Sequence, residues 1–298
     1  MRIVFHLGVH KTASTTIQTA LAEASDALAD RGIFYANTRF PNLLVRQREH
    51  LRRLQSPGRD DPAPDALRKV NRRLLRDAAG AGAHTILISE ENRLGHPLYR
   101  EVADGRRPAR FYPRAEDCLR RVLVGLDDTP TTLLLVTREF HSLLPSLYSE
   151  GLTNLLISET LDEFCAAVDF ATLDFAALCE RIRAAAPEAG LVTHPFEGIR
   201  AGSANFLRDL FSKAGLELGD LDLSDTHVRG GLDRHQSEDI RALVADPDMS
   251  PRRRRQRLAA IRSRARDPEA RLSLPDWALE RLAAASGAAD VDPGARRS

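Results

Sequence analysis

Short continuous apolar runs alternate along the chain with longer stretches whose apolar residues recur at helical spacing. Such short runs are typical of strands buried on both faces of a parallel sheet. They predict four core strands, at 2–7, 85–89, 131–137 and 190–195. The alternation of strands and helices predicts an α/β fold, a P-loop-type parallel sheet flanked by helices, with a helical C-terminal extension.

The pattern also predicts how the chain is divided. Residues 1–225 form the α/β domain, 226–286 a helical extension packed on that domain, and 287–298 a disordered tail of small and polar residues. A length of 298 residues suits one large domain with insertions.

Composition narrows the class of protein. The formal net charge is only +1, whereas a dedicated nucleic-acid binder carries a strong basic excess, so we expect no nucleic-acid partner. Cys118, Cys165 and Cys179 lack the spacing of a metal site and are expected to be reduced and buried. No apolar run reaches membrane-spanning length, and the first apolar run is a core strand and not a signal peptide, so we expect a cytoplasmic protein.

The most informative segment joins the first strand to a helix predicted at 17–28 through a turn of small residues. Hydroxyl groups at a helix start cap free amides, and the positive end of the helix dipole faces the turn. Lys11 adds a full positive charge. The segment therefore predicts a site for a phosphate or sulfate chain, held by Lys11 and by the backbone or hydroxyls of Thr12, Ala13, Ser14, Thr15 and Thr16.

The order of residues in this turn differs from a nucleoside-triphosphate loop, in which the lysine comes last. Residues 10–18 read His-Lys-Thr-Ala-Ser-Thr-Thr-Ile-Gln. This string resembles the 5′-phosphosulfate loop of sulfotransferases, in particular bacterial members that read His-Lys-Thr-Gly-Thr-Thr-Ser-Ile-Gln. The main departure is Ala13 in place of glycine. If that position requires a positive φ, the Cβ costs about 1 kcal/mol.

The resemblance covers roughly residues 1–216 and implies further donor contacts. Arg138 ends a strand and Ser146 follows eight residues later, the spacing with which sulfotransferases hold the 3′-phosphate of 3′-phosphoadenosine 5′-phosphosulfate. A planar, permanently charged guanidinium suits a phosphate. Arg229 and Gly230 resemble, more weakly, a segment that closes over the donor.

Two adjacent carboxylates, Glu90 and Glu91, follow the second predicted strand. Glu91 fits the Ser-x-Glu pattern of the resemblance together with Ser89, and an acidic residue here is a candidate general base. The alternative is a structural role, capping a turn or pairing with an arginine. His10 precedes Lys11 and is a candidate to hold donor or acceptor, or an ordinary structural histidine.

Three other segments matter below. Residues 95–113 are expected to be loop-like and to contribute to acceptor recognition. A helix is predicted at 171–186, with Arg181 on its solvent face. The arginine-rich segment 251–266 suggests either a contact with an anionic glycan or membrane surface, or a solvated helix face whose charge is offset by the nearby acids Asp246, Asp248, Asp267 and Glu269.

These observations lead to one expected function and two alternatives. The resemblance implies an enzyme that transfers a sulfuryl group from 3′-phosphoadenosine 5′-phosphosulfate, without a metal, to a hydroxyl or amine of an unidentified carbohydrate, lipid or small metabolite. The alternatives are a magnesium-dependent P-loop kinase or triphosphatase, and a non-catalytic nucleotide-binding or scaffold protein. The catalytic candidates are Lys11, Glu91, Glu90 and His10.

Overall fold

The computed structural model describes residues 1–36, 64–219, 221 and 231–285. These residues fall into two compact units. Unit 1 comprises Met1–His96, Tyr112–Arg138 and Phe175–Val228, and unit 2 comprises Pro97–Phe111, Glu139–Asp174 and Arg229–Ser298. Each unit is described by itself.

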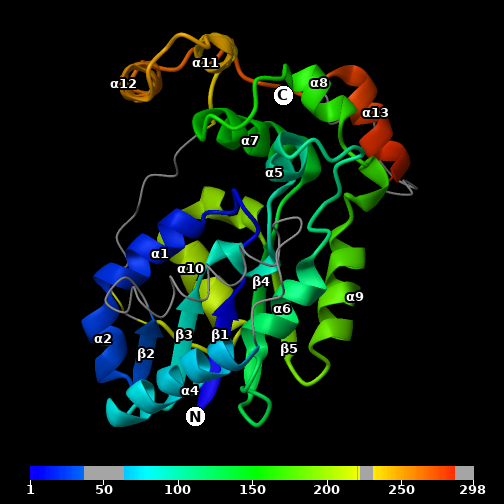
Figure 1. The fold of residues 1–298 in the computed structure, drawn as a ribbon. Coiled ribbons are helices and arrows are strands. Elements are labelled where there is room, and N and C mark those ends of the chain that lie inside the picture. The colour runs from blue at the N-terminus through cyan, green and yellow to red at the C-terminus, as the bar shows by residue number, and fades with distance from the viewer. Residues whose placement is uncertain (37–63, 220, 222–230, 286–298) are drawn as a thin grey trace. The chain divides into compact units, whose positions relative to one another are not determined.

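Unit 1 is built on a five-stranded parallel sheet with the strand order β2-β3-β1-β4-β5 (Figure 1). The strands are β1 (Arg2–His6), β2 (Ile33–Ala36), β3 (Thr85–Ser89), β4 (Thr131–Thr137) and β5 (Gly190–Pro195). The predicted parallel sheet with flanking helices is confirmed. Strand β2 was not among the predicted strands because four residues are too few for a periodic pattern to be recognised.

Helices cover both faces of this sheet (Figure 1). Side chains of α1, α2 and α10 form one core cluster with Val4, Leu87 and Leu134 of the central strands. On the other side α4 contacts β3, α9 contacts β5, and α6 contacts both α4 and α9. The unit 1 helices are α1 (Ser14–Glu23), α2 (Ser25–Asp30), α4 (Pro64–Gly80), α6 (Ala115–Leu123), α9 (Phe175–Ala185) and α10 (Ser203–Ser212), with the 3-10 turns η1 (Glu91–Leu94) and η3 (Phe196–Ala201).

Unit 2 is helical and is organised around α7, which contacts α5, α8, α11 and α13. Its elements are α5 (Leu98–Ala103), α7 (Phe140–Thr153), α8 (Leu161–Ala166), η2 (Phe170–Thr172), α11 (Arg234–Ala245), α12 (Pro251–Arg262) and α13 (Asp276–Ala285). The C-terminal helices therefore share a compact unit with α5, α7 and α8. The packing of an extension over 226–286 on the α/β domain stays a prediction. The segment 95–113 is not simply loop-like, because it contains α5.

The structure bears on two further predictions, the burial of the cysteines and the lack of a membrane-spanning segment. All three cysteines are buried, as predicted, and none forms a disulfide bond with a described residue. Across the described residues, none of the helices combines the length and the apolar character that a membrane span requires.

Candidate functional site

The carboxyl ends of β3, β1 and β4 lie side by side because these strands are parallel neighbours. The lysine-bearing loop follows β1, the paired glutamates follow β3, and Arg138 follows β4. The chain runs from β1 toward β2 and β3 on one side and later to β4 and β5 on the other. Ligands of open α/β sheets bind at such a reversal of strand order. We call this part of unit 1 the sheet edge.

The loop backbone is held in an unusual conformation. Gly8, Lys11 and Ala13 have φ values of 56°, 68° and 64°. A left-handed conformation costs a residue with a Cβ roughly 1–2 kcal/mol, so the strain expected for Ala13 at a positive φ is present. Four described non-glycine residues have positive φ, and three of them, Lys11, Ala13 and Tyr112, lie at this loop. Strain of this kind concentrates at functional sites.

Gly8 fits a narrow space between the loop and β3. A Cβ at Gly8 would lie 3.0 Å from both the Glu91 Cα and the Ser14 Oγ. Only glycine combines this approach with the positive φ. The start of η1 and the start of α1 therefore meet across this residue.

Helix α1 begins without a side-chain cap, which corrects the capping role predicted for Ser14, Thr15 and Thr16. The N-cap residue is Ala13, whose side chain has no oxygen, and the three hydroxyl residues lie within the first turn. First-turn amides have no acceptor inside a helix. Ser14 is only 3% exposed and its Oγ has no hydrogen-bond partner among the described residues. The loop thus offers unused polar groups at the positive end of a helix.

Arg138 fixes the loop at Lys11. Its Nη1 donates a 2.6 Å hydrogen bond to the Lys11 carbonyl, and its Cζ lies 4.5 Å from the centre of the Phe196 ring. The half-buried Lys11 side chain makes no ion pair with the residues that the structure describes. Arg138 thus has a contact that the sequence did not indicate, and its role toward a 3′-phosphate stays a prediction.

Tyr112 fixes the loop one residue earlier. Its hydroxyl accepts a 2.9 Å hydrogen bond from the His10 amide and lies 2.8 Å from the His10 Nδ1. His10 and Tyr112 are 3% and 1% exposed. His10 is therefore packed beneath the loop, a placement that favours the structural alternative over direct contact with a ligand. The Thr12 hydroxyl closes the turn by donating to the Val9 carbonyl at 2.5 Å.

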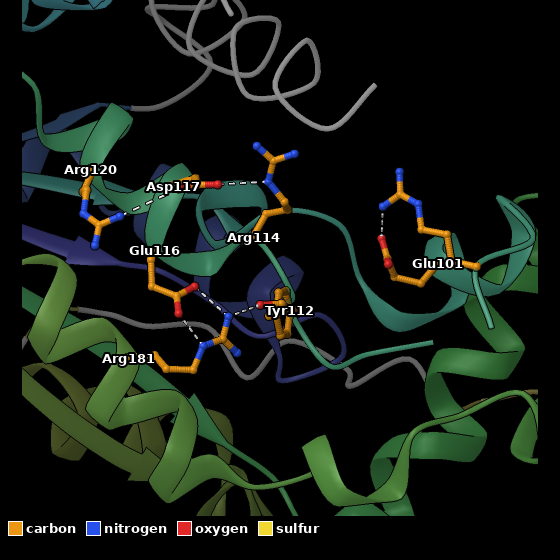
Figure 2. Close-up of polar contacts among 8 residues, drawn as sticks. Glu101, Tyr112, Arg114, Glu116, Asp117, Arg120 and Arg181 are labelled. Atoms are coloured by element: carbon orange, nitrogen blue, oxygen red, sulfur yellow. Dashed lines mark hydrogen bonds and ion pairs between the residues drawn. The ribbon is translucent and has the colours of Figure 1, made fainter. Parts of the chain in front are cut away.

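An ion pair holds Tyr112 in turn. Figure 2 shows Arg181 between Glu116 and the main chain of Tyr112. Arg181 donates to both Glu116 oxygens at 2.6 Å and to the Tyr112 carbonyl at 2.9 Å. Its hydrogen bonds lower the pKa of Glu116. The prediction that Arg181 faces solvent is wrong, because α9 packs against α6 at this residue and leaves the side chain 31% exposed.

A buried polar pair supports the loop from below. The His6 Nδ1 lies 2.8 Å from the Ser89 Oγ, and the two residues are paired in register across β1 and β3. Burial lowers the pKa of His6 to about 4, so the imidazole is neutral at physiological pH. The His6 Nε2 is buried and has no hydrogen-bond partner among the described residues.

The two adjacent glutamates occupy different environments. Glu90 is 6% exposed, accepts a 2.9 Å hydrogen bond from the Asn92 side chain, and contributes with burial to raising the pKa of Tyr35 on β2. Glu91 is half-buried and lies against Gly8 at the loop. Glu91 therefore contacts the loop directly, at Gly8.

The remaining predicted contacts belong to unit 2 or lie outside the described residues. Ser146 is buried on α7 and belongs to unit 2, so its pairing with Arg138 stays a prediction. Arg229 and Gly230 lie outside the described residues. Within the described ranges, no group of three or more His, Cys, Asp or Glu side chains is arranged to hold a metal ion.

Unit 2 contains a cleft of about 440 Å³ that no sequence pattern indicated. Arg234, Arg241, Glu238 and Asp276 line it together with several hydroxyl residues. Its two positive and two negative side chains balance, so the cleft has no preference for a multiply charged anion. The sheet edge of unit 1 is better suited to such a ligand.

Comparison with known proteins adds no identification. No protein-family model matches the chain, and searches of curated proteins and of solved structures found no significant match.

Proposed function

We propose that the protein is a sulfotransferase that transfers a sulfuryl group from 3′-phosphoadenosine 5′-phosphosulfate to a hydroxyl or amine. The observation that carries the proposal is the loop at the sheet edge, where two strained non-glycine residues, Lys11 and Ala13, precede the uncapped start of α1. The buried Ser14 Oγ, which has no hydrogen-bond partner among the described residues, fits a phosphosulfate oxygen. The loop string and its resemblance supply the choice of sulfate over other anions.

The proposed chemistry assigns a task to each residue. The acceptor oxygen or nitrogen attacks sulfur, the bond from sulfur to the bridging oxygen breaks, and the electron pair stays on the departing 3′-phosphoadenosine 5′-phosphate. Lys11 and the first-turn amides of α1 neutralise the charge that develops on that bridging oxygen. Glu91 accepts the acceptor's proton, because it contacts the loop directly at Gly8.

A thermal melt with added ligands tests the proposal. A ligand that binds only the folded state raises the melting temperature. We expect 3′-phosphoadenosine 5′-phosphate to raise it more than AMP, and ATP with magnesium to have little effect. A shift with magnesium and ATP alone would favour the kinase alternative. Donor binding without turnover of any acceptor would favour a non-catalytic protein.

A further inference from the structure

Helix α12 and the residues after it carry a concentration of positive charge that the proposed chemistry does not use. Residues 251–266 contain eight arginines and no acidic residue, in a chain with a net charge of +1. Among the described residues, none of the acids suggested by the sequence forms an ion pair with these arginines. Asp246 and Asp267 instead accept hydrogen bonds from nearby backbone amides, and Arg264 pairs with Asp239. The solvated-face alternative loses its main support, which was charge compensation.

The fold holds this helix in place. Ile261 is buried, and Gln236 of α11 donates hydrogen bonds to the carbonyls of Ile261 and Arg264. The guanidinium of Arg254 donates to two carbonyls at the end of α11. The apolar side of α12 is therefore occupied by α11, and the opposite side is presented to solvent as a fixed surface.

The exposed arginines form two rows. With 3.6 residues per turn, Arg253 and Arg257 lie along one flank of the solvent side, and Arg255 and Arg262 lie along the opposite flank. The row between them consists of small or uncharged residues, namely Gln256, Ala259 and Ala260. Arg252 stands at the start of the helix. Arg255 donates a hydrogen bond to the Pro251 carbonyl. The guanidinium groups of Arg252, Arg253, Arg257 and Arg262 make no hydrogen bond or ion pair with a described residue, and we call these four the α12 arginines.

This arrangement is electrostatically unfavourable for the isolated helix. The first turn contains arginines and no acidic residue, although the helix dipole favours negative charge there. Arg253 and Arg257 are four residues apart, a spacing at which like charges repel. A bound anion would relieve both effects.

We propose that the α12 arginines bind a linear anionic polysaccharide whose sulfate or carboxylate groups lie along the two rows. A guanidinium matches these groups with paired hydrogen bonds. The row of Gln256, Ala259 and Ala260 between the arginines has no bulky apolar side chain to enter a membrane interface. It also has no aromatic ring on which a nucleic-acid base could stack. Because the chain is nearly neutral overall, its residues outside 251–266 carry a net negative charge, which would repel a long nucleic-acid duplex. This inference does not depend on the proposed transfer reaction.

The test measures binding of the full chain to fluorescent dextran sulfate, with uncharged dextran as the neutral control. Four contacts of this kind predict that affinity falls about 50- to 150-fold between about 50 and 200 mM salt, by analogy with nucleic-acid backbones. A variant with Arg252, Arg253, Arg257 and Arg262 all changed to Gln should lose at least about tenfold in affinity and most of that salt dependence. Gln keeps the helix propensity close to that of Arg.

A matched variant removes the same total charge from α4, by changing Lys69, Arg72, Arg73 and Arg76 to Gln. It should bind dextran sulfate as the wild type does. Equal losses in the two variants would mean that net charge alone is responsible, and absence of binding at low salt would leave α12 a solvated face. Tighter binding of phosphatidylglycerol vesicles or of duplex DNA than of dextran sulfate would overturn the choice of polysaccharide.

Discussion

The sheet edge of unit 1 and the helix α12 of unit 2 both present positive charge, yet they are built in opposite ways. The sheet edge has one lysine in a loop held by Arg138 and Tyr112. Helix α12 has six arginines, of which the four α12 arginines are exposed and make no hydrogen bond or ion pair with a described residue. A preorganised loop can select one small ligand by its geometry, whereas a row of exposed charges binds an extended polyanion and is screened by salt. Specificity therefore resides in the backbone around Lys11 and not in the number of charges.

The largest loss of turnover should come from changing the proposed general base, because no other residue of the sheet edge is proposed to accept the acceptor's proton. Glu91→Gln should lower turnover by about 10²–10⁴-fold, the usual range for a general base. Donor binding should persist. Glu90→Gln is the matched control and should be much milder, since Glu90 is engaged with Asn92. Release of 3′-phosphoadenosine 5′-phosphate from the donor measures both. If the Glu90 variant is the crippled one, the two roles are exchanged.

Removing a single charge from each region compares them directly. Lys11→Ala should reduce turnover by about 10²–10³-fold with little change in the unfolding midpoint, because it removes an electrostatic contribution to the transition state. Arg257→Ala removes the same charge from α12 and should leave turnover unchanged. Similar losses in the two variants would mean that both act only through the general field of the protein.

The contacts of Tyr112 with the loop should affect catalysis by holding Lys11 in position. Tyr112→Phe keeps the ring but removes the hydroxyl that accepts from the His10 amide. The loss of one hydrogen bond predicts a roughly 3- to 10-fold lower kcat/KM. In a Lys11→Ala background the same change should have almost no effect, because the two residues belong to one unit. Equal effects in both backgrounds would reduce Tyr112 to a general structural role.

Arg181→Ala tests the contact that holds Tyr112 in turn, the hydrogen bond from Arg181 to the Tyr112 carbonyl. A control residue lies on the same helix. Arg183 also pairs with a glutamate, but in an exposed i,i+3 arrangement. Arg183→Ala should therefore leave kcat/KM unchanged, while Arg181→Ala should lower it in the same way as Tyr112→Phe.

The smallest effect concerns the strain at Ala13. Ala13→Gly removes the Cβ from a left-handed position but makes the unfolded chain more flexible. The two effects predict a net gain of about 0.5–1 kcal/mol in the free energy of unfolding. Ala22→Gly, inside the same helix, should instead cost about 1 kcal/mol. Urea denaturation measures both, and destabilisation by Ala13→Gly would contradict the assigned strain.

The sequence predicted most of the sheet because buried parallel strands are short apolar runs. It also placed the loop, Glu91 and Arg138 at one edge, since parallel strands end together. It missed β2, whose four residues are too few for a pattern. It assigned capping roles to Ser14, Thr15 and Thr16, which instead lie within the first turn. The capping position depends on where the helix begins, and the left-handed Ala13 sets that point.

The contacts that hold the Lys11 loop in place could not be predicted from the sequence. Tyr112, Glu116 and Arg181 come from a segment expected to be a loop and from two helix faces whose packing only the tertiary structure defines. Nothing local distinguishes Arg181 from Arg183, two residues later on the same helix. The one sequence signal was the aromatic Tyr112 directly before a proline, which is too common to indicate a contact.

The central claim is that the sheet edge, and not α12, selects a 3′-phosphorylated nucleotide. Calorimetric titration of 3′-phosphoadenosine 5′-phosphate into the wild type, Lys11→Ala and the α12 four-arginine variant tests it most directly. We expect one site in the wild type, with affinity about ten- to a hundredfold higher than for AMP, the size of a charge-assisted contact to the 3′-phosphate. Binding should be weakened in Lys11→Ala and unchanged in the α12 variant. Equal affinity for AMP, or loss of binding in the α12 variant alone, would contradict the account.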